Sequence, residues 1–210
     1  MGRHESERQD MVALLRDRGI RDEAVLRAFA KVERHLFVPE PFTSRSYEDS
    51  ALPIGKGQTI SQPYTVAIMT EAMEVRPGAK TLEVGTGSGY QAVLLAELGA
   101  RVFTVERDID LLAGARRIFD RLGHRIASKA GDGTVGWNEF APFDGIVVTA
   151  GAPDIPEPLM SQLAEGGKLV IPVGDLDVQT MVVITRKGDQ FDRREISGFK
   201  FVPLVGKMGW

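Results

Sequence analysis

Apolar and polar positions follow two different patterns, and the change falls near residue 62. Before it, residues 6–34 have the 3.6-residue spacing of two short helices, and Asp22 is placed to cap the second one. Residues 42–62 show no clear period. Their glycines and prolines predict a long ordered loop, a kind of segment that often carries function in compact domains.

From Tyr64 onwards, helical segments alternate with short apolar strands. Apolar strands separated by helices predict a parallel sheet that is covered on both faces. The last two strands are joined by a turn at residues 187–190, so they predict an antiparallel hairpin. We expect strands at 81–84, 101–105, 125–130, 143–149, 168–172, 180–186 and 191–197, and helices at 64–74, 90–98, 108–122 and 156–165.

The fold class is therefore α/β, with a doubly wound, mostly parallel sheet, an antiparallel C-terminal hairpin and an N-terminal helical appendage. We expect residues 1–62 to supply the N-terminal helices and a substrate-side loop. Residues 63–210 would form the ligand-binding α/β unit, and the two parts would pack as a single domain.

Composition narrows the function classes. The 210 residues carry a formal net charge of -3, which argues against a protein that binds chiefly to nucleic-acid phosphates. Cysteine is absent, which excludes disulfides, thiolate catalysis and Cys-ligated metal, and we expect no metal site. The first residues are charged, and no run of about 18 apolar residues occurs, so we expect a cytoplasmic protein.

The glycine-rich segment after the first strand of the sheet is the strongest motif. Residues 82–90 read LEVGTGSGY and join that strand to the next helix, so Gly85, Gly87 and Gly89 allow a tight turn beneath a nucleotide-like ligand. Glu106 ends the following strand, where a carboxylate can accept both hydroxyls of a ribose.

The spacing of these glycines favours S-adenosylmethionine over a dinucleotide. Dinucleotide-binding loops read G-x-G-x-x-G and direct N–H groups at a pyrophosphate, whereas this loop reads G-x-G-x-G. S-adenosylmethionine has no phosphate and carries a sulfonium and an ammonium group. An acidic residue just before the loop, here Glu83, suits those cations and would be unfavourable beside a pyrophosphate.

A wider set of segments resembles the protein-L-isoaspartate (D-aspartate) O-methyltransferase family. The loop EVGTGSGYQ resembles the family's first motif, and LPIGKGQTISQP resembles the loop that precedes it. The glycine loop alone would be shared by many methyltransferases, so the combination carries the resemblance. The matching segments are residues 52–63, 83–91, 131–133, 136–137, 142–153, 166–174 and 201–204.

The resemblance implies a Rossmann-like methyltransferase fold and a monomeric enzyme that uses S-adenosylmethionine. Its substrates would be isoaspartyl residues of damaged proteins and peptides, whose methyl esters collapse to a succinimide. It assigns the adenine amino group to Asp132. The implied cofactor-binding residues are Glu83, Gly85, Thr86, Gly87, Ser88, Gly89, Glu106, Asp132 and Gly133, and the implied substrate-binding residues are Thr59, Ile60, Ser61, Gln62 and Val202.

Methyl transfer to a carboxylate needs positioning more than acid or base chemistry. An Asp-like carboxylate, with an ordinary pKa of about 3.9, is already ionised at neutral pH. Ser61 is the candidate catalytic residue, because its hydroxyl can donate a hydrogen bond to the acceptor. From its position alone, two residues before Pro63, Ser61 would be interpreted as a helix cap; the resemblance favours the catalytic role.

Three other functions stay open at this point. A methyltransferase for RNA or a small metabolite would share the fold, although residues 149–153 read TAGAP and lack the Asn/Asp-Pro-Pro-aromatic pattern associated with exocyclic-amine methylation. A cofactor-binding protein without activity is disfavoured by the intact Ser61 and Glu106. An NAD-dependent oxidoreductase is disfavoured by the spacing of the glycines.

Overall fold

A seven-stranded sheet forms the centre of the protein. The computed structural model describes residues 2–210, the side chain of Ser197 excepted. The first five strands in the order given below run parallel, and the last two are antiparallel, which confirms the expected sheet and its C-terminal hairpin. Across the sheet the order is β5 (Ala127–Ala130), β4 (Arg101–Glu106), β3 (Lys80–Val84), β6 (Phe143–Val148), β7 (Leu163–Gly174), β8 (Gln179–Lys187) and β9 (Gln190–Phe199).

Neighbouring residues of the central strands belong to different halves of the core. On β6, Val147 packs with the N-terminal helices, whereas Ile146 and Val148 pack with the opposite cluster. Side chains alternate between the two faces of a strand, so a strand that is apolar throughout must be covered on both sides. This explains the continuous apolar runs seen in the sequence.

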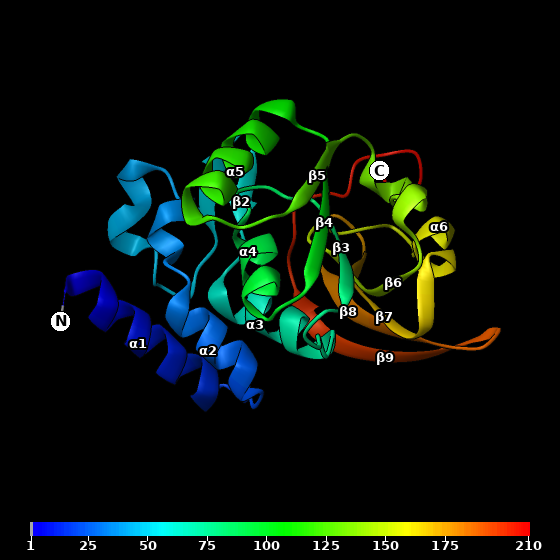
Figure 1. Ribbon diagram of the computed structural model, residues 1–210, viewed down its shortest axis with the longest axis horizontal. Coiled ribbons are helices and arrows are strands. Elements are labelled where there is room, and N and C mark those ends of the chain that lie inside the picture. The colour runs from blue at the N-terminus through cyan, green and yellow to red at the C-terminus, as the bar shows by residue number, and fades with distance from the viewer. Residues whose placement is uncertain (1) are drawn as a thin grey trace.

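Helices α1 to α5 lie on one side of the sheet, where α1 and α2 pack on α3 and α4, and the short helix α6 lies on the other side (Figure 1). The second helix begins where the sequence predicts, because the carboxylate of Asp22 accepts the N–H of Ala24 at 2.7 Å. The helices are α1 (Arg3–Asp17), α2 (Glu23–Lys31), α3 (Pro63–Ala72), α4 (Tyr90–Glu97), α5 (Ile109–Leu122) and α6 (Glu157–Ser161), with short 3-10 helices η1 (Arg34–Phe37), η2 (Glu40–Arg45), η3 (Gly133–Val135) and η4 (Asn138–Phe140).

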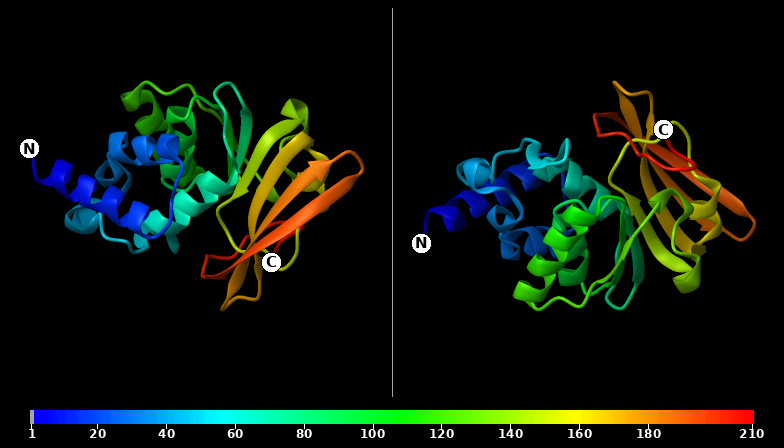
Figure 2. Two further views of the ribbon diagram at one scale, coloured as in Figure 1. Left: turned by 90° about the horizontal axis from the view of Figure 1, so that it is seen from below. Right: turned by 90° about the horizontal axis from the view of Figure 1, so that it is seen from above.

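The N-terminal helices share their core with one face of the sheet. Buried side chains of α1 and α2 belong to the same apolar cluster as Val147, Val170 and Met181 of the sheet. The two further views show the N-terminal segment packed beside the other helices, with the antiparallel strands at the far end of the molecule (Figure 2).

The predicted loop at residues 42–62 contains regular structure that its pattern did not reveal. Strands β1 (Leu52–Gly55) and β2 (Gln58–Ile60) pair as an antiparallel hairpin. Its turn takes φ of 93° at Gly55, 55° at Lys56 and 69° at Gly57, which is left-handed backbone that glycine adopts without strain. The strands span only 4 and 3 residues, too few for a period to be seen.

The helix expected at 156–165 is shorter than predicted. It spans only Glu157–Ser161, and the chain is already in strand β7 at Leu163. Phe143 pairs with Leu163, and the next pair is Gly145 with Lys168, so the pairing is irregular between Leu163 and Lys168. Residues Gly166 and Gly167, expected to end a helix, instead lie in this irregular portion.

Within residues 2–210, no helix combines the length and apolar character that crossing a membrane requires.

Gly114 gives a test of the helix assignment for α5. A Cβ placed there would meet only the Arg117 side chain, at 3.8 Å, so there is room for a methyl group. Alanine is preferred to glycine inside helices by about 1 kcal/mol. We expect Gly114→Ala to raise the free energy of unfolding by about 0.5–1 kcal/mol, measured by urea denaturation. A decrease would show that the backbone there needs glycine.

Candidate active site

A cavity of about 390 Å³ opens at the carboxyl edge of the parallel strands. Strand β3 is hydrogen-bonded to β4 on one side and to β6 on the other, so the connections that follow β3 and β6 leave in different directions. Such a switch point leaves a crevice where α/β proteins bind ligands. The glycine segment 85–89 follows β3 at this point.

The three glycines of this turn, of which Gly85 and Gly87 line the crevice, have a backbone conformation that other residues rarely adopt. Gly85, Gly87 and Gly89 have φ of 95°, 53° and 87°. A side chain at Gly85 would also collide with the hydroxyl of Thr149, which would lie 2.4 Å from the added Cβ. The motif is therefore required both by backbone conformation and by the close packing of neighbouring strands.

Glu106 fixes the glycine turn from the end of the next strand. Its Oε2 accepts the N–H of Gly87 at 2.8 Å, and its Oε1 accepts the N–H of Asp108 at 2.9 Å. A carboxylate offers about four acceptor positions, so each oxygen keeps one for a ligand. The side chain is buried and lines the cavity, as the sequence predicts for a group that binds a ribose.

Glu83 is a fully buried carboxyl group beside the same turn. The hydroxyl of Thr104 donates to its Oε2 at 2.5 Å, while Oε1 has no hydrogen-bond partner among the described residues. Burial raises the pKa of Glu83 to about 8, although the Thr104 hydroxyl acts to lower it. An unpartnered buried oxygen is costly, and a cationic ligand in the cavity would remove that cost.

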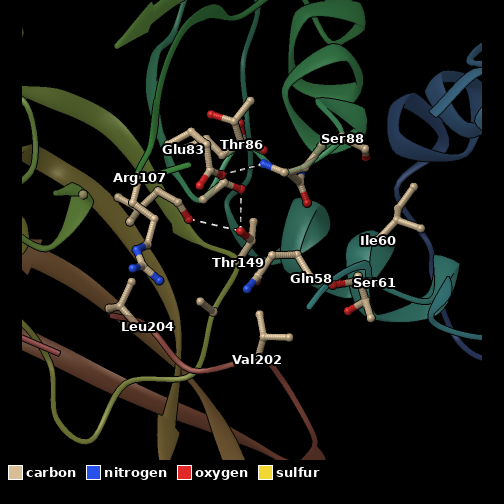
Figure 3. Close-up of a pocket in the computed structure, with 18 of the residues that line it drawn as sticks. Gln58, Ile60, Ser61, Glu83, Thr86, Ser88, Arg107, Thr149, Val202 and Leu204 are labelled. Carbon is tan, nitrogen blue, oxygen red and sulfur yellow. Dashed lines mark hydrogen bonds between the residues drawn. The ribbon is translucent and has the colours of Figure 1, made fainter. Parts of the chain in front are cut away.

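The other wall of the cavity is built by the β1–β2 hairpin and the segment before α3. Ser61 and Gln58 lie across the cavity from Glu83, with Val202 and Leu204 along a further wall (Figure 3). The N-cap of α3 is Gln62, and no side chain of this segment caps that helix, so Ser61 does not serve as the cap that its position alone suggests.

A smaller hollow of about 40 Å³ adjoins the main one. Ser61, Thr59, Val202 and Thr149 line both hollows and therefore lie where the two meet. The remaining residues of the small hollow are Ala51, Gln62, Thr65, Lys200 and Phe201.

Most of the residues expected from the sequence come together here, with two exceptions. Gly89 does not line the cavity and instead lies against Phe119, where an added Cβ would be 2.6 Å away. Asp132 does not line it either, because its carboxylate is turned to the N–H groups of Thr134 and Lys207. The expected residues that line one or both hollows are Glu83, Gly85, Thr86, Gly87, Ser88, Glu106, Gly133, Thr59, Ile60, Ser61, Gln62 and Val202.

Several lining residues were missed by sequence reasoning. Thr149 follows the apolar core of β6, a position at the carboxyl edge that could have been flagged from the strand pattern. Arg107 follows Glu106 and lies near Leu204 in the close-up (Figure 3). Leu204 and Val205 enter from the C-terminal segment, whose approach no local pattern reveals. Among residues 2–210 no group of three or more His, Asp or Glu side chains is placed to hold a metal.

Comparison with known proteins identifies the family. The family model described as "Protein-L-isoaspartate(D-aspartate) O-methyltransferase (PCMT)" matches residues 6–209. The chain belongs to this family. Relatives named protein-L-isoaspartate O-methyltransferase include one from Chlorobaculum tepidum, 57% identical over 97% of this chain and 96% of its own, and one from Dictyoglomus thermophilum, 52% identical over 99% and 94%.

A solved structure agrees with this assignment. A Plasmodium falciparum protein assigned to the same activity, and crystallised in complex with S-adenosyl-L-homocysteine, superposes with a TM-score of 0.83. Its sequence is 28% identical, and the match covers 98% of this chain and 99% of that one. The expected Rossmann-like methyltransferase fold is confirmed, and an NAD-dependent oxidoreductase is set aside.

The raised pKa of Glu83 predicts pH-dependent binding of the family's cofactor product. Below pH 8 the carboxyl group holds a proton, which must leave before it can pair with a ligand ammonium. The affinity for S-adenosylhomocysteine should therefore rise with pH between 6 and 8, by at most about tenfold per unit, and level off above. Titration calorimetry between these pH values measures the affinity.

Glu83→Gln is the matched control, because it keeps the shape and loses the titration. The part of the pH dependence that Glu83 causes should disappear in this variant. Without ligand, the folded state of the wild type holds a proton that the unfolded chain releases near its ordinary pKa of 4.5, so its stability falls as pH rises toward 8. At pH 8 the unliganded variant should then be the more stable protein. If the stability of the two proteins changed equally with pH, the raised pKa of Glu83 would be contradicted.

Proposed function

We propose that this chain methylates the free carboxylate of L-isoaspartyl residues in damaged proteins and peptides, with S-adenosylmethionine as the donor. The observation that carries the proposal is the position of Ser61, where the glycine-floored cavity meets the smaller hollow. The two ligands of a transfer reaction need adjoining sites that share a boundary. Membership of the family agrees with this reaction.

The main cavity has the groups that a sulfonium donor requires. Glu83 offers an unpartnered carboxyl oxygen for the ammonium end, and Glu106 keeps acceptor positions for the ribose hydroxyls. The turn formed by residues 85–89 lets the backbone approach the ligand closely. Gly133 also lines this cavity, and we assign the adenine to its neighbourhood, with Asp132 next to it in the chain.

The smaller hollow suits the peptide that carries the acceptor. We assign its lining residues Thr59, Gln62 and Val202, together with Ile60 of the main cavity, to substrate binding. Ser61 is assigned the catalytic role of donating its hydroxyl hydrogen to one oxygen of the acceptor carboxylate, which leaves the other oxygen directed at the methyl group.

For this reaction the protein must align the methyl donor with the acceptor carboxylate and exclude water. When bound, S-adenosylmethionine supplies an electrophilic methyl group, and transfer to the carboxylate oxygen forms a C–O bond, breaks the C–S bond and leaves the electron pair on sulfur. The acceptor is already ionised, so none of the chain's histidines is needed as a base. In the released ester, the next backbone nitrogen displaces methanol to form a succinimide, whose hydrolysis returns part of the product as normal aspartate.

The proposed repair function also concerns the class of substrate, the assembly and the location of the enzyme. The net charge of -3 supports protein and peptide substrates over nucleic acid. We propose that the enzyme acts as a monomer in the cytoplasm. We also propose that residues 1–62 form the substrate side and that residues 63–210 hold the cofactor.

Paired peptides test the substrate. We expect methyl transfer to a peptide containing an isoaspartyl residue and little transfer to the same peptide with aspartate, because the isoaspartyl link places the free carboxylate on a different branch of the backbone. Incorporation of labelled methyl groups measures both. Equal transfer to the two peptides, or none to either, would contradict the proposed function.

Ser61→Ala tests the acceptor side. Loss of the orienting hydroxyl should lower kcat by about tenfold to a hundredfold and leave the KM for the methyl donor nearly unchanged, since the donor lies in the other hollow. Ser161→Ala is a matched control, because Ser161 is exposed on α6 and donates only to the carbonyl of Pro158, at 3.0 Å. A kcat unaffected by Ser61→Ala would remove the catalytic role.

A further inference from the structure

Ser61 lies in a two-residue connection between β2 and α3, so both of these elements determine where its hydroxyl points. Strand β2 ends at Ile60, and α3 begins at Pro63. Ile60 is paired with Leu52 of β1, so the chain that leads into β1 is tied to one side of Ser61. The same stretch of chain, residues 46–51, also contacts the start of α3 on the other side.

The start of α3 is capped by a side chain from this distant segment. Oδ1 of Asp49 accepts the backbone N–H of Tyr64, the second residue of α3, at 2.9 Å. In most helices the residue at the N-cap position supplies such an acceptor. Here the side chain of the N-cap residue Gln62 makes no cap, and Pro63 at the first helical position has no N–H to satisfy. Asp49 therefore takes the place of a local cap, from 15 positions earlier in the chain.

Arg18 holds the carboxylate of Asp49 in this position. Its Nη1 donates to Oδ2 of Asp49, the oxygen that α3 does not use, and its guanidinium lies over the ring of Tyr64, 3.6 Å from the centroid. The side chain of Asp49 is only 15% exposed, so its hydrogen bonds are largely shielded from water. Arg18 follows α1 directly, so these three residues connect the end of α1 with the start of α3.

The segment that carries Asp49 is itself fixed by a buried arginine. The side chain of Arg34, in η1, is fully buried; its Nε donates to the carbonyl of Ser46 at 2.7 Å, and its Nη2 donates to the carbonyl of Ser50 at 3.2 Å. These two hydrogen bonds lie on either side of Asp49 in the chain. Breaking either one would leave a buried guanidinium N–H without its partner, which is unfavourable. Asp49 thus presents its carboxylate to α3 from a well-supported loop.

We propose that Asp49 is a positioning residue for methyl transfer, which fixes the orientation of Ser61 through its cap on α3. A serine near the start of a helix commonly turns its hydroxyl to the free N–H groups there. Because Asp49 accepts the N–H of Tyr64, the Ser61 hydroxyl is left for the substrate carboxylate. Asp49 lines neither hollow, so it acts only through other residues. The inference rests on the proposed function, which gives Ser61 its catalytic role.

A double-mutant cycle tests whether Asp49 acts through Ser61. Asp49→Ala should lower kcat for an isoaspartyl peptide by about tenfold, because a small misplacement of an orienting group lowers the rate strongly. In the Ser61→Ala background the same substitution should change kcat by less than about twofold, since no hydroxyl remains to be positioned. The KM for S-adenosylmethionine should stay nearly unchanged in both backgrounds. A role confined to overall stability would lower kcat equally with and without the hydroxyl.

Two further variants separate the cap from the loss of a charge. Asp49→Asn keeps an oxygen that can accept the N–H of Tyr64, so its kcat should lie within about threefold of the wild-type value. Glu48→Ala is the matched control for removal of a carboxylate, because Glu48 is exposed and pairs with the exposed Arg45 at 2.9 Å. It should leave kcat unchanged.

Arg18→Ala keeps the test decisive if Asp49→Ala disturbs folding. It leaves the cap in place and removes only the group that holds it, so kcat should fall by about threefold, and again not in the Ser61→Ala background. Titration calorimetry with S-adenosylhomocysteine identifies the variants that keep a folded donor site.

The outcomes for the inference and for the proposed function are distinct. Suppose that the wild type methylates the isoaspartyl peptide. If the folded variant, Asp49→Ala or otherwise Arg18→Ala, then leaves kcat unchanged, or lowers it by the same factor with and without the Ser61 hydroxyl, the inference is overturned. If the wild type transfers no methyl group to that peptide, the proposed function itself fails, and the inference fails with it.

Discussion

A carboxylate at the end of strand β4 holds the glycine turn that follows the neighbouring strand β3, and the whole site depends on this contact. Glu106 accepts the N–H of Gly87 at 2.8 Å, which fixes a turn whose glycines all lie at positive φ. Parallel strands β3 and β4 end at the same edge of the sheet, so their last residues are brought together by the fold itself. Without this hydrogen bond, no contact from β4 would hold the turn in the conformation that leaves room for a ligand.

Three carboxyl groups lie at this edge of the sheet, and they differ in how many hydrogen bonds they accept from the protein. Asp132 accepts three hydrogen bonds and is directed away from the cavity. Glu106 accepts two, one on each oxygen. Glu83 accepts one, on a single oxygen, and its other oxygen is buried without a partner. Buried polar groups are normally paired, so the unpartnered one marks the place where a ligand completes the structure.

The sequence was sufficient for those parts of the site that a continuous motif encodes. The segment 83–89 and Glu106 could be placed because strands and helices alternate with clear periods, and a parallel sheet puts their ends together. The hairpin at residues 52–60 was missed because its strands are too short for a period. The helix expected at 156–165 was wrong beyond Ser161, because pairing between Phe143 and Leu163 overrides local preference.

Contacts between distant segments could not be foreseen in the same way. The resemblance assigned the adenine amino group to Asp132, whereas its place between two glycines fits a simple turn equally well. The structure pairs its carboxylate with a backbone N–H 75 positions along the chain, which is a tertiary contact without a local pattern. The position of Thr149 at the end of β6 follows from the strand pattern, but the hydrogen bond from its hydroxyl to the carbonyl of Gly85, at 2.7 Å, does not.

The C-terminal segment links the two ligand sites through one short stretch of chain. Gly151 donates its N–H to the carbonyl of Val202 at 2.8 Å and accepts the N–H of Leu204 at 2.7 Å, so this segment lies against the end of β6 as a short parallel bridge. Val202 lines both hollows, and Val205, three residues later, lines only the larger one. A displacement of the tail, residues 205–210, at one end must therefore either break the Gly151 bridge or move Val202 with it. Because the indole of Trp210 also donates to the carbonyl of Gly151, the bridge and the tail are fastened at the same residue. The walls of the two hollows thus share a common support, which suits the in-line transfer between two separately bound ligands that is proposed above.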